Sequence, residues 1–67
     1  MGALIRKIAT YLVKNWNKLS GPVKWAIEQV AGWAIVEAIE AGVNAVIDFL
    51  SGLSDWVIEK IAGILGI

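Results

Sequence analysis

The sequence predicts an all-α protein, and three observations indicate this fold class. Apolar residues recur every three or four positions through most of the chain, which is the spacing of amphipathic helices. No segment alternates between apolar and polar residues over the length of a half-buried strand. Short segments rich in glycine, serine and proline separate the periodic stretches. They divide a single domain, residues 1–67, into four predicted helices at about 3–19, 22–31, 33–50 and 54–65.

The first predicted helix has one apolar side and one basic side. The apolar residues at helical spacing are Leu4, Ile5, Ile8, Leu12, Trp16 and Leu19. The residues opposite them are Arg6, Lys7, Thr10, Lys14, Asn17 and Lys18. The helix is expected to stop at the segment SGP, where Ser20 or Gly21 can cap. Pro22 suits the first turn of the next helix, because its missing N–H would be unpaired there anyway.

The second and third predicted helices are separated by the phase of their apolar residues. The inward residues of the second are Val23, Ala26, Ile27 and Val30. Continuing its phase past Gly32 would place Glu37 within the apolar stripe, so we expect a break there and a restart at Trp33. The third helix then has an apolar face of Ile35, Ile39, Val43, Val46 and Leu50. Its polar face carries Glu37, Glu40, Asn44 and Asp48.

Two features of the second half concern glycine and helix capping. Gly42 lies on the apolar side of the third helix without shifting its phase, so it is interpreted as a notch for close helix approach, with a kink as the alternative. Ser54 is the expected cap of the last helix, and Asp55 lies favourably at its N-terminal dipole. The expected inward residues of this helix are Val57, Ile58, Ile61, Ile64 and Leu65.

Composition excludes several kinds of protein. The absence of cysteine and histidine excludes disulfides and the usual zinc sites. Stability must therefore come from apolar packing, in agreement with 58% hydrophobic residues and a mean hydropathy of +0.70. Charges interrupt every apolar run before the roughly 20 residues of a transmembrane helix. The N-terminal residues match neither a signal peptide nor a myristoylation motif, which has Ser or Thr where Arg6 stands.

Catalysis, cofactor binding and nucleic-acid binding are not expected. Without His and Cys the common nucleophile–base pairs are missing. The carboxylates one turn apart, Glu37 with Glu40 and Asp55 with Glu59, are interpreted as solvated polar faces. An isoelectric point near 6.1 argues against a nucleic-acid-binding domain.

The charges are divided between the two parts of the chain, although the net charge is zero. Residues 1–27 hold five cations and no acid, which gives a charge of +5. Residues 28–67 hold six acids and one cation, Lys60, which gives −5. This division allows self-association through the oppositely charged halves.

The four tryptophans are the second unusual feature of the sequence. Trp16 lies at the edge of its apolar stripe, whereas Trp25, beside Lys24, lies opposite the apolar side of its helix and should be exposed. Trp33 flanks the acidic side of the third helix, and Trp56 faces away from the apolar side of the last. Such rings either pack against a neighbouring helix or lie at a membrane–water interface.

Three segments resemble the leaderless bacteriocins of the aureocin and lacticin Q type. These are the C-terminal SDWVIEKIAGILGI, the turn GPVKWA at residues 21–26, and the basic amphipathic start MGALIRKIATYLVK. The resemblance implies a compact four-helix saposin-like bundle, made without a leader peptide and secreted. It also implies killing of Gram-positive bacteria by permeabilising their membranes. Family members are cationic throughout and shorter, whereas this chain is neutral. Circular bacteriocins share the bundle, so a bond joining Ile67 to Met1 stays an alternative.

The resemblance and the residue pattern together predict a set of membrane-binding residues. The family's lipid-contacting cations correspond to Lys7, Lys14, Lys18, Lys24 and Lys60, and its interfacial rings to Trp25 and Trp56. The basic first helix and the remaining rings add Arg6, Trp16 and Trp33. The expected partner is anionic bacterial membrane lipid. The alternative function is a small helical interaction module that binds a partner helix or self-associates.

Overall fold

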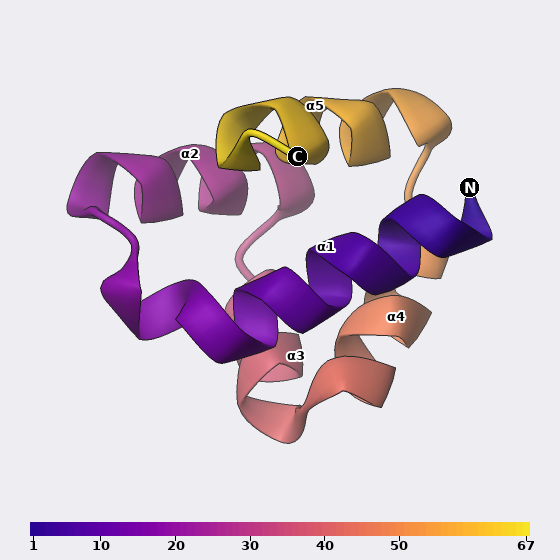
Figure 1. Cartoon of the computed structure of the whole chain (residues 1–67), viewed down its shortest axis with the longest axis horizontal. Helices are drawn as coiled ribbons and strands as arrows, with labels where there is room; N and C mark the ends of the chain where they lie inside the picture. Colours follow the sequence, from indigo (N-terminus) through magenta and orange to yellow (C-terminus); the bar gives the residue numbers. More distant parts are fainter.

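The computed structural model describes all 67 residues, and every regular element in it is helical (Figure 1). The elements are α1 (Gly2–Asn15), a turn of 3₁₀-helix η1 (Trp16–Lys18), α2 (Gly21–Ala31), α3 (Ile35–Ala41), α4 (Val43–Ser51) and α5 (Asp55–Leu65). The all-α class is therefore confirmed. The structure has five α-helices where four are predicted, because residues 33–50 form two helices.

The division between α3 and α4 occurs at Gly42. Its backbone has φ 118° and ψ 179°, a region that is essentially restricted to glycine. A Cβ atom added at Gly42 would meet no other atom within 4 Å, so the predicted notch for close helix approach is wrong. Gly42 instead provides the backbone conformation of the turn between α3 and α4. The apolar residues keep one phase on both sides of it, which is why periodicity alone does not reveal the break.

The end of α1 differs from expectation, whereas both ends of α2 agree with it. The predicted helix 3–19 ends as an α-helix at Asn15 and continues only as η1, after which Leu19 is extended. Of the two candidate caps in the SGP segment, the structure selects Ser20, which caps α2: its hydroxyl accepts a hydrogen bond from the N–H of Val23 at 3.4 Å. The predicted break at Gly32 is confirmed by its φ of 99°.

The helices are arranged in two pairs with α1 between them (Figure 1). Helix α2 packs beside α5, and α3 packs against α4. Helix α1 crosses the middle of the view and contacts α3, α4 and α5. The result is a compact body with extents of 26 × 23 × 19 Å.

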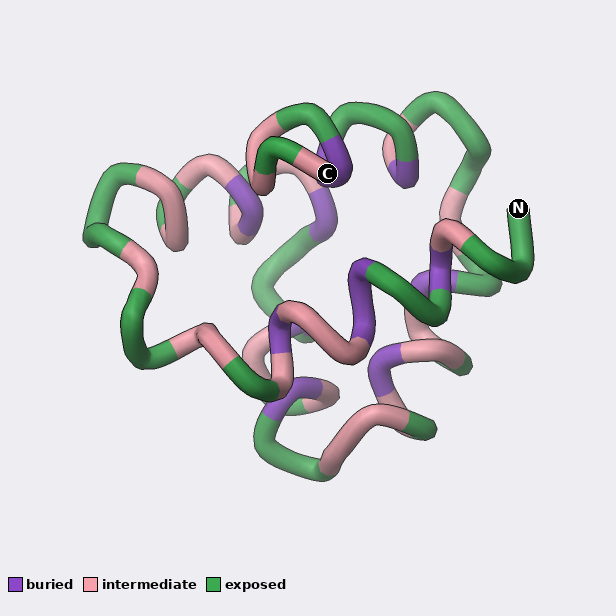
Figure 2. The backbone as a smooth tube through the Cα atoms, in the orientation of Figure 1, coloured by how far each residue is buried: buried purple, intermediate pink, exposed green.

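The core consists only of apolar side chains, with no buried polar or charged residue. Figure 2 shows that every helix contributes a buried segment on its inward side. The largest fully buried side chains are Ile8, Leu12, Ile27, Ile35, Val46, Leu50, Ile58 and Ile61. All of them belong to the predicted apolar stripes. Burial of each stabilises the fold by roughly 1.5–3 kcal/mol, which is how a chain without disulfides holds together.

The C-terminal helix is closed at both ends. The hydroxyl of Ser54 accepts a hydrogen bond from the N–H of Val57 at 3.4 Å, which confirms the predicted cap. At the other end Gly66 adopts φ 76°, and the N–H of Ile67 donates to the carbonyl of Ala62 at 2.9 Å. This Schellman ending folds Ile67 back against the core.

Candidate functional site

Three of the four tryptophans are exposed to solvent. The exposed fractions are 63% for Trp25, 74% for Trp33 and 66% for Trp56. The predicted exposure of Trp25 is confirmed. Trp56 does not bury its ring against a neighbouring helix, so the packing interpretation of this residue is wrong. Exposure of a ring of this size to water is unfavourable. A site that accommodates both the apolar ring and its polar N–H stabilises it.

Trp56 makes a cation–π contact with a lysine on the same helix. The ammonium nitrogen of Lys60 lies 5.6 Å from the centre of the Trp56 ring, within the range of a cation–π interaction. The two residues are four positions apart and therefore adjacent on the surface of α5. An exposed aromatic ring and a positive charge are thus presented together at this surface.

The second cation–π pair joins two elements. The ammonium nitrogen of Lys24 on α2 lies 5.8 Å from the centre of the Trp16 ring in η1. Trp16 is half-buried and packs against the core, as its place at the edge of the apolar stripe predicts. Lys24 is half-buried too, and its ring partner is Trp16 across the SGP turn and not its neighbour in sequence, Trp25.

The structure corrects the predicted position of Trp33. The helix that follows Gly32 begins at Ile35 and not at residue 33. Trp33 and Ala34 form the turn between α2 and α3, so Trp33 does not lie on the acidic side of a helix. Because the extended backbone of Gly32 ends α2, the ring projects from a turn and is the most exposed of the four.

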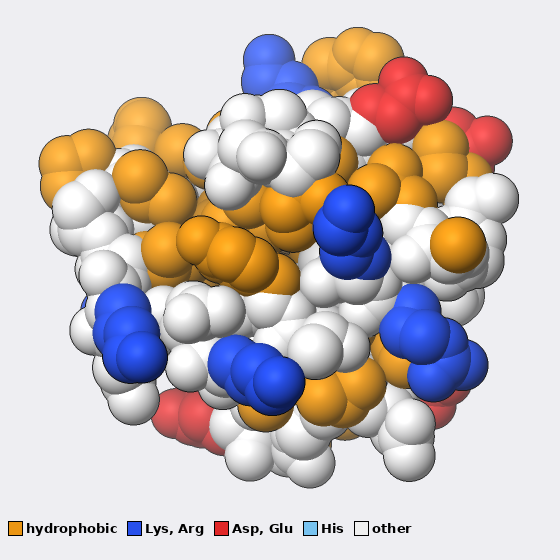
Figure 3. Space-filling model, in the orientation of Figure 1, with side chains coloured by type: hydrophobic (Ala, Val, Ile, Leu, Met, Phe, Trp, Pro, Cys, Tyr) orange, Lys and Arg blue, Asp and Glu red, His pale blue; other side chains and the backbone are white.

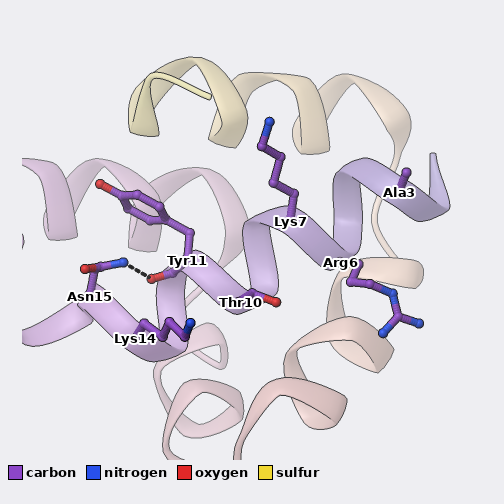
Figure 4. A pocket seen from close by; sticks show the side chains of 7 residues that line it. All are labelled: Ala3, Arg6, Lys7, Thr10, Tyr11, Lys14 and Asn15. Atoms are coloured by element: carbon purple, nitrogen blue, oxygen red, sulfur yellow. Dashed lines mark hydrogen bonds between the residues drawn. The ribbon is translucent and has the colours of Figure 1, made fainter.

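Three cations gather along the outer face of α1. An open depression of about 420 Å³ runs along this face. The residues that line it are Ala3, Arg6, Lys7, Thr10, Tyr11, Lys14 and Asn15 (Figure 4). The other three predicted cations lie outside it: Lys18 in η1, Lys24 on α2 and Lys60 on α5. We call the seven lining residues the α1 depression.

Two polar residues of the α1 depression were not anticipated from the sequence. Tyr11 and Asn15 follow Lys7 at intervals of four, so they share its row on the helix surface. That spacing is the signal that could have identified them. The side-chain amide of Asn15 donates a hydrogen bond to the backbone carbonyl of Tyr11 at 3.1 Å, which holds it against the helix (Figure 4).

The charges on the surface are separated in space as well as in sequence. In Figure 3 most Lys and Arg side chains lie in a band across the visible face and one lies at its top edge, whereas the Asp and Glu side chains show at the upper right and along the lower border. No acid precedes Glu28 in the chain. The outward residues Glu37, Glu40 and Asp48 make the α3–α4 pair acidic, and no cation lies on these two helices.

The structure holds no cluster of Asp and Glu side chains that could bind a metal ion. None of its helices combines the length and the apolar character needed to cross a membrane.

Comparison of the chain with protein families, with curated proteins and with solved structures finds no match.

Proposed function

We propose that this protein is a secreted antimicrobial bacteriocin that binds and permeabilises the membranes of Gram-positive bacteria. The observation that carries the proposal is the combination of three exposed tryptophans with a helix whose exposed face holds cations and no acid. In this proposal α3 and α4 act as one bent helix, so that the fold corresponds to a four-helix saposin-like bundle.

The attraction to lipid is local and does not require a net positive charge. Each Lys or Arg near an anionic membrane surface contributes about 1 kcal/mol of binding free energy, an effect that decays within about a Debye length. When α1 faces an approaching membrane, the cations on its outer face lie closer to the lipid than the acids of α3 and α4. A molecule oriented with α1 toward the lipid is therefore attracted, although its total charge is zero.

The exposed rings add an apolar contribution once the surface is reached. Trp25 and Trp56 lie on the neighbouring helices α2 and α5, and Lys60 accompanies Trp56. Transfer of an exposed indole into the interface stabilises the bound state by roughly 2 kcal/mol. Insertion of these rings, followed by separation of the helices so that their apolar stripes enter the lipid, would permeabilise the membrane.

Leakage of a trapped dye from phosphatidylglycerol-containing vesicles tests the proposal. We expect leakage at micromolar protein, much less leakage from purely zwitterionic vesicles, and growth inhibition of Gram-positive indicator strains. Trp25→Ala should weaken vesicle binding by about tenfold or more. The control Gln29→Ala, at an exposed position one turn further along α2, should leave it unchanged. Absence of both leakage and growth inhibition would disprove the proposal.

The second candidate function is a helical interaction module, and the same exposed tryptophans favour it, since such rings anchor partner helices. Fluorescence separates the two functions. A membrane-active protein shifts its tryptophan emission to shorter wavelength on addition of anionic vesicles, whereas an interaction module leaves the emission unchanged.

A further inference from the structure

We infer that the α1 depression is a discrete phosphate-binding site that takes the headgroup of an anionic phospholipid. The inference rests on the proposed function and goes beyond it. General attraction between a basic helix and a membrane needs no particular position for any cation. A discrete site, in contrast, requires that the phosphate contacts three of the six cations and that the other three lie outside it.

The three cations of the α1 depression extend from the outer face of α1 in different directions (Figure 4). In Figure 4 the side chain of Lys7 extends toward α5, and that of Arg6 extends toward α4. Lys14 lies two turns further along the helix, at an axial distance of roughly 12 Å from Arg6. Short side chains, Ala3 and Thr10, separate these long ones and leave the space open. An anion over this face of α1 would have cationic residues on both sides and at one end, and their long side chains would turn toward it on binding.

The donors of the α1 depression match the oxygens of a phosphate group. Arg6 offers a planar fork of N–H donors, and lysine ammonium groups bind phosphate as point charges. The hydroxyls of Thr10 and Tyr11 are additional donors. No carboxylate lines the depression, so nothing in it repels an anion or competes for the cations.

The surroundings of the α1 depression favour a lipid over free phosphate. Figure 3 shows hydrophobic side chains directly beside the row of cations, between α1 and the α2–α5 pair. The ring of Tyr11, half-buried at the border, belongs to both the polar and the apolar region. A phosphate joined to a glycerol and acyl chains would contact both regions at once, whereas inorganic phosphate would use only the first.

Amide chemical shifts during titration of the ¹⁵N-labelled protein test the site in solution. The three probes are inorganic phosphate, short-chain phosphatidylglycerol below its micelle concentration, and short-chain phosphatidylcholine as the zwitterionic control. We expect saturable shifts confined to residues 3–15, with phosphatidylglycerol binding more tightly than either other probe. Shifts spread over all six cations, or none, would overturn the site. Equal affinity for inorganic phosphate and phosphatidylglycerol would overturn the lipid assignment.

A matched pair of double variants separates a site from diffuse attraction. Arg6→Gln with Lys14→Gln removes two charges from the α1 depression, and Lys18→Gln with Lys60→Gln removes two from outside it. We expect the first variant to lose at least tenfold in affinity for short-chain phosphatidylglycerol and the second less than twofold. Equal losses would overturn the site.

Dye leakage from vesicles distinguishes a failure of the site from a failure of the function. If leakage persists while the two double variants behave alike, membrane activity stands and the discrete site is wrong. If the saturable shifts are present but no vesicle leaks, the phosphate site stands and permeabilisation is wrong. Unchanged dispersion of the amide spectrum in both double variants confirms that the fold is intact, as expected for substitutions at exposed positions.

Discussion

Helix α1 and the α3–α4 pair bury similar side chains but present opposite charges to solvent. The inward residues are Ile5, Ile8, Ala9 and Leu12 from α1, and Ile35, Ile39, Val46 and Leu50 from the pair. The outward charged residues are Arg6, Lys7 and Lys14 on the first and Glu37, Glu40 and Asp48 on the second. The comparison shows that the inward faces determine the fold, while the outward faces are free to serve function.

The two regions also differ in how the backbone follows the apolar stripe. Helix α1 carries its stripe through 14 residues without interruption. The α3–α4 pair turns at Gly42 into helices of 7 and 9 residues, which then pack against each other. A continuous helix suits a long basic surface, and the turned pair closes the body on the side away from α2 and α5.

The largest expected effect tests whether the inward faces are equivalent. Leu12 of α1 and Leu50 of α4 are both fully buried, so Leu12→Ala and Leu50→Ala should each lower the free energy of unfolding by about 2–5 kcal/mol. Urea unfolding followed by circular dichroism measures this loss. Asn44→Ala, at an exposed position of α4, should change stability by less than about 0.5 kcal/mol. If only one of the two substitutions lowers the free energy of unfolding by less than about 1 kcal/mol, the inward faces of α1 and α4 are not equivalent.

A smaller effect tests the turn that distinguishes the α3–α4 pair from α1. Gly42→Ala should lower the free energy of unfolding by about 1–3 kcal/mol, because the backbone at φ 118° and ψ 179° is strained for any other residue. Gly63→Ala is the matched control, since Gly63 lies within α5 with open space around it. That substitution should raise stability by roughly 0.5–1 kcal/mol. If Gly42→Ala also stabilises the protein, the two helices are continuous in solution.

The smallest effect concerns the opposite outward charges. We propose that the basic face of α1 pairs with the acidic face of α3–α4 in a second copy at low salt, and that about 0.5 M salt separates the copies. Sedimentation velocity at both salt concentrations measures this. Glu37→Gln with Glu40→Gln should reduce association, and Asp55→Asn with Glu59→Gln, which removes two acids from α5, should not. A monomer under both conditions would contradict the pairing.

Much of the helical pattern could be predicted from local features of the chain. The caps at Ser20 and Ser54 and the break at Gly32 follow from residue types that satisfy or interrupt helix ends. Periodicity does not reveal the break at Gly42, because the apolar residues on both sides keep one phase. Glycine permits either a continuing helix or a turn, and packing of the two short helices selects the turn.

The candidate site also combines features that could be predicted from the sequence with features that could not. Helical spacing places Arg6, Lys7 and Lys14 on one side of the first helix, and all three line the α1 depression. The early end of α1 at Asn15 removes Lys18 from that row. The partnership of Lys24 with the Trp16 ring spans the SGP turn, and helical spacing does not describe contacts across a turn.

Except for the buried alanines Ala9, Ala31 and Ala62, the inward residues of each helix follow from the sequence, as do the all-α class and the separation of charge along the chain. These properties depend on period, residue type and order, which are local. The pairing of α2 with α5, the turn of the α3–α4 pair at Gly42 and the exposure of the Trp33 and Trp56 rings depend instead on the tertiary structure. Each of these outcomes depends on which apolar stripes meet in three dimensions, and several arrangements bury the same stripes.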